Sequence, residues 1–322
     1  MSEKVMSKRT KVLAREPSTP WWRKKRTLSQ GQPSSIALLL GPYFLLFTFF
    51  IVIPVGVAIL LSFTYFNSIE APQFSGIQNY IYLFTKDDVF VRYVLPNTLM
   101  FALVVGPLGY ILQFLLAWEL AHIQHIPRTI LALIFYSPSM TGATTMAVIW
   151  KVLFSGDQYG YLNSWLMRNG WIQAPVQWIT DPKYLMGIML FVSVWSSMGV
   201  GFLSMLSGIL NVDQQLYEAG YIDGVSSRFQ EIVYITIPAM KPQMLFGAVM
   251  SIVSAFSAGA IGVQLAGANP TPQYAGQTMI SHIEDHGFIQ YNMGYASALS
   301  VILMLLMFMS SQIAEYFFGT DD

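Results

Sequence analysis

The 322-residue sequence contains no cysteine, which excludes structural disulfides, thiolate metal sites and thiol catalysis. Charged residues are also scarce: Asp, Glu, Lys and Arg make up 11% of the chain, against about 25% in soluble domains. Hydrophobic residues account for 54% of the sequence. This balance excludes an ordinary soluble domain and predicts a protein that crosses a membrane several times.

The sequence also lacks the groups with which a membrane protein drives transport alone. It has no glycine-rich, lysine-containing loop of the kind that binds nucleotide phosphates. A proton- or sodium-driven carrier usually places acidic side chains deep inside the bilayer. Here the central parts of the predicted spans contain none, and Glu119 lies at the end of the second span. We therefore expect the energy for transport to come from another subunit.

Six apolar runs are long enough to cross about 30 Å of hydrocarbon as helices. They cover residues 36–63, 95–120, 129–154, 185–210, 244–265 and 292–318. We predict an all-α integral membrane protein with six transmembrane helices in a domain over residues 36–322. Residues 1–35 are basic and rich in proline and serine, which predicts a disordered cytoplasmic tail. A basic block before a first span sets topology, so we expect no nucleic-acid partner.

The basic residues indicate which side of the membrane each loop faces. Nine of the 17 Lys and Arg residues lie in the first 26 positions. An N-terminus inside the cell puts twelve of the 17 on the cytoplasmic side, as the positive-inside bias requires. Both termini and the loop over residues 211–243 are then cytoplasmic. The external segments are residues 64–95, 156–184 and 266–291.

The cytoplasmic loop between the fourth and fifth spans is long for a connector and has helical character. Asn211 or Asp213 can cap a first helix, and Gly224 permits a break after it. A second short helix is expected to end at Pro238 and Pro242. We predict a helix-turn-helix on the membrane surface, able to transmit force from a partner to the spans on both sides.

This loop contains Glu218-Ala219-Gly220, then Asp223-Gly224, then Ile235-Thr236-Ile237-Pro238. The pattern resembles the "EAA" loop of permease subunits of bacterial ATP-binding-cassette importers, which reads Glu-Ala-Ala, three residues, Gly, nine residues, Ile-x-Leu-Pro. Here Gly220 stands for alanine, Ile237 stands for leucine, and ten residues separate Gly224 from Ile235. The extra residue leaves the phase of the second helix open.

The resemblance implies a set of partners. Such a permease pairs with a second permease, rests on two cytosolic ATPase subunits and receives solute from an extracytoplasmic binding protein. Glu218 would offer its carboxylate to a basic residue of an ATPase. The small Ala219 and Gly220 would let the helix sit deep in a cleft. The implied coupling residues are Glu218, Ala219, Gly220, Asp223, Gly224 and Pro238.

The resemblance also implies a division of labour between subunits. The chain itself would be no enzyme and would bind no cofactor, while ATP and magnesium would be used by the ATPase subunits. The alternative interpretation is a secondary carrier or channel subunit that ATP does not drive. A membrane-embedded enzyme would need a cluster of His, Asp or Glu inside a span, and the sequence shows none.

Most of residues 36–318 resemble the carbohydrate branch of this family, and specifically the permease with the longer N-terminal tail. Residues 149–154 and 160–163 carry this likeness. Residues 234–238 and 241–242 are similar to importers of plant or algal polysaccharide fragments, including acidic ones. The resemblance thus implies a bacterial inner-membrane protein that imports a sugar or oligosaccharide.

Polar and aromatic residues in the spans are candidates for the solute path. Aromatic faces suit sugar rings, which favours Trp195 and Tyr295. Asn292, Ser254 and Ser257 are able to hydrogen-bond a sugar. Helix packing explains small residues such as the serines without any ligand, and aromatic residues also serve as core, so both interpretations stay open.

Candidate metal ligands are few, because the chain has four histidines and no cysteine. His122 and His125 lie three positions apart in the short loop after the second span. No carboxylate or cysteine near them completes a ligand set. We therefore predict no metal site.

Overall fold

The computed structural model describes residues 33–319, so the tail predicted over residues 1–35 lies almost wholly outside the described residues. The chain divides into two compact units, Met1–Gly56 and Val57–Asp322. Helix α2 (Pro33–Phe47) runs into the π-helical turn η2 (Thr48–Val52), which continues as α3 (Ile53–Leu61). These three elements form the first predicted span.

The described residues contain five helices that are long and apolar enough to cross a membrane. They cover Leu39–Leu61, Phe90–Ala121, Pro182–Leu210, Lys241–Ala266 and Met293–Phe318. A sixth span results if α6 (His125–Met140) and α7 (Ala143–Leu153), which bend by 100°, are counted together. The all-α prediction is confirmed, but the third span is a broken helix where the sequence predicted a continuous one.

Some helical segments begin before the apolar runs do, and polar residues cap two of the long helices. Helix α9 (Pro182–Trp195) starts behind Asp181, whose Oδ1 accepts a hydrogen bond from the Lys183 backbone N at 2.9 Å. The π-helical turn η3 (Phe90–Val94) leads directly into α5 (Leu95–Ala121), which lengthens the second span. Asn292 caps α17 (Met293–Phe318).

Two further spans are interrupted. Residues 196–199 separate α9 from α10 (Val200–Leu210). A 3₁₀ turn, η5 (Ala258–Ala260), separates α14 (Lys241–Ser257) from α15 (Ile261–Ala266). Three of the spans are therefore broken within their apolar runs. The sequence predicted continuous helices there, because hydropathy does not show where a backbone leaves the helical path.

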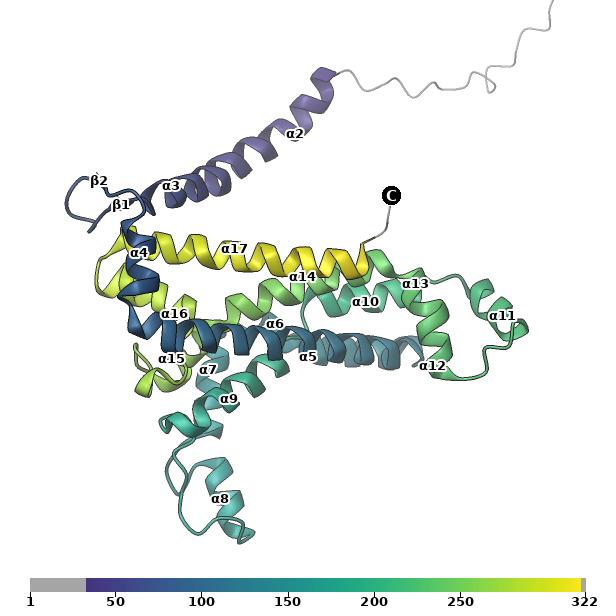
Figure 1. The fold of residues 1–322 in the computed structure, drawn as a ribbon. Helices are drawn as coiled ribbons and strands as arrows, with labels where there is room; N and C mark the ends of the chain where they lie inside the picture. Colours follow the sequence, from purple (N-terminus) through teal and green to yellow (C-terminus); the bar gives the residue numbers. More distant parts are fainter. Residues whose placement is uncertain (1–32, 320–322) are drawn as a thin grey trace, which may run out of the picture. The chain divides into compact units, whose positions relative to one another are not determined.

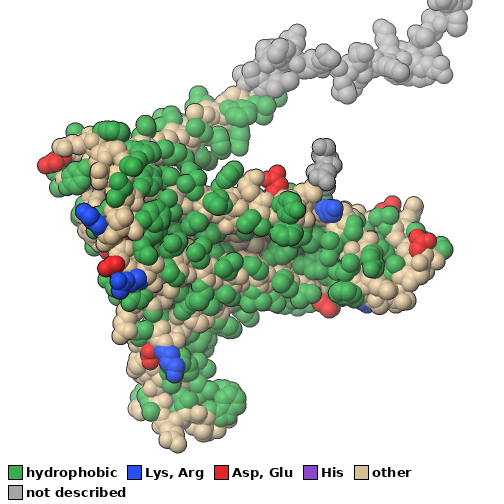
Figure 2. Space-filling model, in the orientation of Figure 1, with side chains coloured by type: hydrophobic (Ala, Val, Ile, Leu, Met, Phe, Trp, Pro, Cys, Tyr) green, Lys and Arg blue, Asp and Glu red, His purple; other side chains and the backbone are tan. Residues whose placement is uncertain are grey.

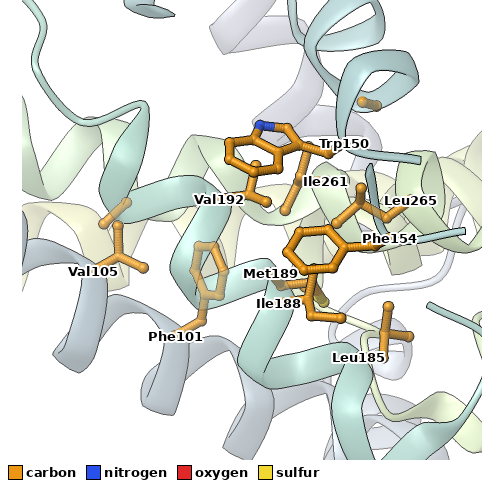
Figure 3. Close-up of a cluster of buried hydrophobic side chains, with 12 residues drawn as sticks. Phe101, Val105, Trp150, Phe154, Leu185, Ile188, Met189, Val192, Ile261 and Leu265 are labelled. Carbon is orange, nitrogen blue, oxygen red and sulfur yellow. The ribbon is translucent and has the colours of Figure 1, made fainter. Parts of the chain in front are cut away.

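In the second unit, α5, α10, α14 and α17 pack along one another (Figure 1). Small residues let α10 and α14 approach closely, since a Cβ on Gly201 would lie 3.3 Å from the backbone of Gly247. A cluster of buried apolar side chains joins α5, α7, α9 and α15 (Figure 3). Phe101, Trp150 and Met189 belong to this cluster, which lies beside the broken segments.

The connecting elements gather at two opposite ends of these helices (Figure 1). One end holds β1 (Thr64–Tyr65), β2 (Gln73–Phe74), α4 (Gln78–Thr85), α16 (Met279–Glu284) and the π-helical turn η7 (Asp285–Ile289). The same external segments contribute α8 (Tyr161–Arg168) and the 3₁₀ turn η6 (Pro272–Tyr274).

The other end holds the predicted cytoplasmic loop, with α11 (Gln214–Ile222), α12 (Arg228–Glu231), the π-helical turn η4 (Ile232–Thr236) and α13 (Ile237–Ala239). On the face shown in Figure 2, charged side chains lie mostly toward the two ends of the helices and hydrophobic side chains between them. This distribution is the one expected of a bilayer-spanning domain, with water at both ends.

We expect Gly201→Ala to destabilise the helix packing. The new Cβ would lie 2.6 Å from Gln113 Oε1 and 3.3 Å from the backbone of Gly247, so α10 and α14 must separate. Overpacking of this kind costs about 1–3 kcal/mol. The measurement is the thermal unfolding midpoint in detergent. Gly187→Ala in α9 is the control, because its Cβ would meet no atom within 4 Å. Equal midpoints for the two variants would contradict the close packing.

Candidate functional site

The cytoplasmic loop folds as two short helices joined by a sharp turn. Asp213 caps α11, with its Oδ1 accepting from the Gln215 backbone N at 2.9 Å. Gly224 has φ +97°, a conformation that side-chain-bearing residues rarely adopt, and it reverses the chain after α11. Ser227 and Gln230 form a capping box that starts α12. The predicted helix-turn-helix is confirmed.

The second helix of the loop runs from Arg228 through η4 to Ala239, and it ends next to Pro238 as predicted. Met240 leaves the helical conformation, with φ −114° and ψ 20°. Pro242 instead lies in the first turn of α14, where the N–H that proline lacks has no intrahelical partner in any case.

The second helix of the loop contains the π-helical turn η4 over Ile232–Thr236. A π-helical turn contains one residue more than an α-helical turn. The second helix can therefore accommodate the extra residue between Gly224 and Ile235.

Most of the predicted coupling residues lie on the loop surface. Glu218, Ala219, Asp223, Gly224 and Pro238 are exposed. Gly220 is half-buried, and a Cβ there would lie 2.5 Å from Ile235 Cδ1. The small residue at this position thus lets α11 pack against the second helix of the same loop.

Apolar side chains on the loop face outward beside Glu218. Ile222 is 88% exposed and Phe229 is 74% exposed. A hollow of about 510 Å³ lies between the two helices, lined by Leu216, Ala219, Asp223, Val225, Tyr234 and Pro238. Exposed apolar groups next to a carboxylate, at an end of the molecule that faces water, are typical of a surface that binds another protein.

Buried polar contacts connect the loop to the transmembrane helices. Glu231 of α12 is buried, and its carboxylate lies 3.2 Å from Arg228 Nη1 and 3.9 Å from His122 Nε2. His122 follows the last turn of α5, where its Nδ1 lies 2.8 Å from the Trp118 carbonyl oxygen. The buried carboxylate of Glu231 thus lies between α12 and the end of α5, beside two side chains that are more exposed to solvent.

Within α11, Tyr217 makes a corresponding contact. Its hydroxyl lies 3.2 Å from the hydroxyl of Thr236, which is fully buried in the second helix. The first helix of the loop is thus joined to the segment that leads directly into α14.

A cavity of about 490 Å³ lies where the three broken spans meet. Its wall includes the break between α6 and α7, the break between α9 and α10, and the η5 turn. Seven serines line it: Ser139, Ser193, Ser196, Ser197, Ser251, Ser254 and Ser257. Non-helical backbone at membrane depth is tolerated where it lines such a cavity, so the breaks and the cavity belong together.

Gln113 of α5 holds the break in the fourth span. Its Nε2 donates to the Ser197 carbonyl oxygen at 2.7 Å, and its Oε1 accepts from Ser251 Oγ of α14 at 3.4 Å. Gln113 is 3% exposed. One turn earlier, Gly109 leaves room for Ser197, since a Cβ there would lie 2.9 Å from Ser197 Oγ. Together these residues tie the cavity wall to α5.

Two buried polar atoms on the cavity wall have no hydrogen-bond partner among the described residues. They are Ser196 Oγ and Gln264 Oε1. A buried polar group without a partner is costly, which indicates that this wall suits a polar ligand or water. The cavity can therefore offer hydroxyl and amide groups to a polar solute.

The structure brings together only part of the predicted solute path. Ser254 and Ser257 line the cavity. Trp195 is 54% exposed and packs edge-on against Trp150. Asn292 caps α17, and the buried Tyr295 hydrogen-bonds to Asp87 at the external end. Trp195, Asn292 and Tyr295 are therefore not among the residues that line the cavity.

Sequence reasoning missed Gln113 and Gln264, the two amides at the cavity. The available signal was an uncharged polar side chain within an apolar run, because polar groups are rare in hydrocarbon unless they have a role. His122 and His125, the two histidines considered as metal ligands, do not converge on a common acid. His122 lies beside Glu231, whereas His125 is exposed at the start of α6.

Comparison with known families gives one clear result. The family described as "Binding-protein-dependent transport system inner membrane component" matches residues 109–318. The region includes the loop and every residue that lines the cavity except Val105.

Several curated proteins are similar over nearly their whole length. The probable ABC transporter permease protein YesP of Bacillus subtilis (strain 168) is 27% identical over 285 residues, 88% of this chain and 90% of that protein. The arabinooligosaccharides transport system permease protein AraP of the same organism is 26% identical over 293 residues, 90% of each chain. The sulfoquinovosyl glycerol transport system permease protein SmoG of Agrobacterium fabrum is 25% identical over 303 residues, 94% of this chain and 95% of that one.

A solved structure has the same fold. It is a chain of a bacterial ABC transporter involved in the import of the acidic polysaccharide alginate, with a TM-score of 0.72 and 21% identity. The match covers 88% of this chain and 94% of the other.

We expect Gln113→Leu to weaken the fold around the cavity. The variant removes the hydrogen bonds to the Ser197 carbonyl and to Ser251, and a buried group deprived of its partner costs about 1–3 kcal/mol. Thermal unfolding in detergent measures the loss. Gln312→Leu, at an exposed position of α17, is the matched control. A Gln113→Leu protein as stable as this control would show that Gln113 does not hold the break.

Proposed function

The chain belongs to the family of binding-protein-dependent transport system inner membrane components, and we propose that it is the sugar-translocating permease subunit of an ATP-driven importer. The solute is a sugar or oligosaccharide delivered by an extracytoplasmic solute-binding protein. The relatives support this choice, because AraP is named for arabinooligosaccharides and SmoG for sulfoquinovosyl glycerol. The chain lies in the bacterial inner membrane.

The observation that carries the proposal is the two-helix loop at the cytoplasmic end. Its exposed Glu218 lies one helical turn before the exposed Ile222 of α11, and α12 of the same loop exposes Phe229. Such a surface fits a cleft that presents a basic side chain, where a charge-assisted hydrogen bond forms with water largely excluded. An ATPase subunit with such a cleft is the partner that the pattern Glu218 to Pro238 implies.

Polar side-chain contacts connect this surface to the cavity. An ATPase that closes on ATP would displace α11. The Tyr217–Thr236 contact would pass the displacement to the segment before α14, and the Glu231–His122 contact would pass it to α5. Both α5 and α14 hold the cavity wall through Gln113 and Ser251. Rigid helices moving at a site between broken spans are a common means of alternating access.

The cavity wall supports a hydroxyl-rich solute. Serine hydroxyls and the amides of Gln113 and Gln264 line it, and its lining includes no Lys, Arg, Asp or Glu. Sugar hydroxyls both donate and accept hydrogen bonds, and so do these side chains. Ser254 and Ser257 are the residues of the predicted path that this proposal retains.

The remaining partners follow from the same proposal. The assembly consists of this chain, a second permease subunit that is a different chain, two cytosolic ATPase subunits and the solute-binding protein. The external segments 64–95, 156–184 and 266–291 would receive the binding protein. ATP and Mg²⁺ would act in the ATPase subunits, and this chain would contribute no catalytic residue.

We expect Glu218→Lys to uncouple transport while leaving the transmembrane fold intact. Glu218 is exposed, and losing a charge-assisted hydrogen bond of about 1.5–3 kcal/mol weakens ATPase binding roughly 10- to 100-fold. Co-purification of the ATPase and ATP-dependent uptake of radiolabelled arabinooligosaccharide in proteoliposomes are the readouts. Glu315→Lys, another exposed acid, toward the cytoplasmic end of α17, is the control.

A second pair of variants separates the turn from a general loss of stability. Gly224 (φ +97°) and Gly170 (φ +72°) both have space around the Cβ position, so alanine causes similar local strain at either site. Only Gly224→Ala should reduce ATPase co-purification. Uptake that persists with every ATPase removed would instead support the secondary carrier.

We expect Ser196→Ala and Gln264→Leu to impair sugar uptake without loss of ATPase binding. Both side chains line the cavity and have a buried polar atom without a partner among the described residues. Loss of one hydrogen bond to the solute corresponds to about a 2- to 12-fold rise in the apparent KM. Ser300→Ala is the control, because this serine of α17 bonds to its own helix at Ala296. An unchanged KM in both cavity variants would remove the cavity from the solute path.

A further inference from the structure

A buried cluster of ionisable side chains lies at the external end, away from the loop and the cavity. Asp87 stands between α4 and η3, His282 lies in α16, His286 lies in η7 and Tyr295 lies in α17. Asp87 is 8% exposed and His282 is 4% exposed. Two segments far apart in sequence thus place a carboxylate and two imidazoles in one apolar environment, next to Leu83, Phe90 and Met279.

The geometry of the cluster points to a bound cation, and we propose that Asp87, His282 and His286 form a zinc site. One ligand atom from each residue lies within 4.8 Å of the other two. The Asp87 Oδ2 atom is 2.9 Å from His282 Nε2 and 4.0 Å from His286 Nε2. Ligand atoms about 2.0 Å from a tetrahedral zinc ion are about 3.3 Å apart, which lies between these two distances.

His286 is the residue that distinguishes a metal site from a simple hydrogen-bonded pair. Its Nε2 faces Asp87 at 4.0 Å, too far for a hydrogen bond, and its buried Nδ1 has no partner among the described residues. A cation between Asp87 and His286 would give His286 Nε2 a partner, while Nδ1 would keep none among the described residues.

The carboxylate is already held in place for such a role. Asp87 Oδ1 accepts from the Phe90 backbone N at 2.8 Å, and Asp87 Oδ2 accepts from the Tyr295 hydroxyl at 2.6 Å. Partners of this kind orient a ligating carboxylate.

The two histidines have a spacing that suits a common ion. His282 and His286 are four positions apart, which places both on one face of a helix, and their rings lie 4.5 Å apart between centroids. Zinc accepts two imidazoles and one carboxylate, with a fourth position left for water or for the Tyr295 oxygen. The ion would fasten α16 and η7 to the segment before the second span, and so stiffen the external end.

The test uses the full-length chain in lipid nanodiscs, purified with a tag that contains no histidine and stripped with a chelator. We expect the wild-type chain to bind one Zn²⁺, measured by elemental mass spectrometry, and to unfold at a higher temperature with zinc. Cobalt should give the visible absorption of a tetrahedral ion. His286→Phe should bind zinc at least about 100-fold more weakly, since even a lost outer partner costs about 10- to 100-fold.

The control variants separate metal binding from packing. His286→Phe keeps a ring against Tyr295, and the His286 side chain has no hydrogen bond to another described residue, so the metal-free unfolding temperature of the variant should match the wild type. His125→Phe should bind zinc normally. If His286→Phe fails to fold, chemical modification of the wild type decides: zinc should protect His282 and His286, but not His125.

Absence of stoichiometric zinc in the wild type would overturn the proposal, as would equal zinc binding by His286→Phe. These readouts do not involve transport, so their outcome is independent of the proposed function.

Discussion

The structure depends on one constraint: backbone that leaves the helical path inside a membrane must find its hydrogen-bond partners within the protein. Three spans break at similar positions, and the Gln113 amide reaches the carbonyl of Ser197 in one of the breaks. The same amide meets Ser251 on α14. The Gln113 side chain thus provides a hydrogen-bond partner for the interrupted helix. It also connects α5, the break after α9 and α14 on the cavity wall.

The cavity follows from the same constraint. Because helices that end at membrane depth expose polar groups, their ends converge on a space where those groups can meet a polar partner. Serines from three interrupted spans line this space, while the apolar cluster around Phe101 and Met189 packs beside it. A polar interior enclosed by apolar helices is what a passage for a hydroxyl-rich solute requires.

Polar contacts with little access to solvent connect both ends of the unit to its long helices. At the cytoplasmic end, Glu231 meets His122 after the last turn of α5. At the external end, Asp87 joins the segment before the second span to α16 and α17. Since α5 runs between these two contacts, a displacement of the loop at one end can reach the segments at the other.

The sequence by itself determined the number of apolar runs, their orientation and the loop with Glu218, because hydropathy, charge bias and a local motif are all read from neighbouring residues. It predicted the turn at Gly224 and the end of the second helix near Pro238, but not that Pro242 begins α14 or that the second helix contains a π-helical turn. Only the tertiary structure decided where spans break, and it placed Gln113 beside Ser197 and Asp87 beside His282 and His286. Those residues lie up to about 200 positions apart in the sequence. A local pattern cannot predict which distant side chains will form hydrogen bonds or share a site once the helices pack.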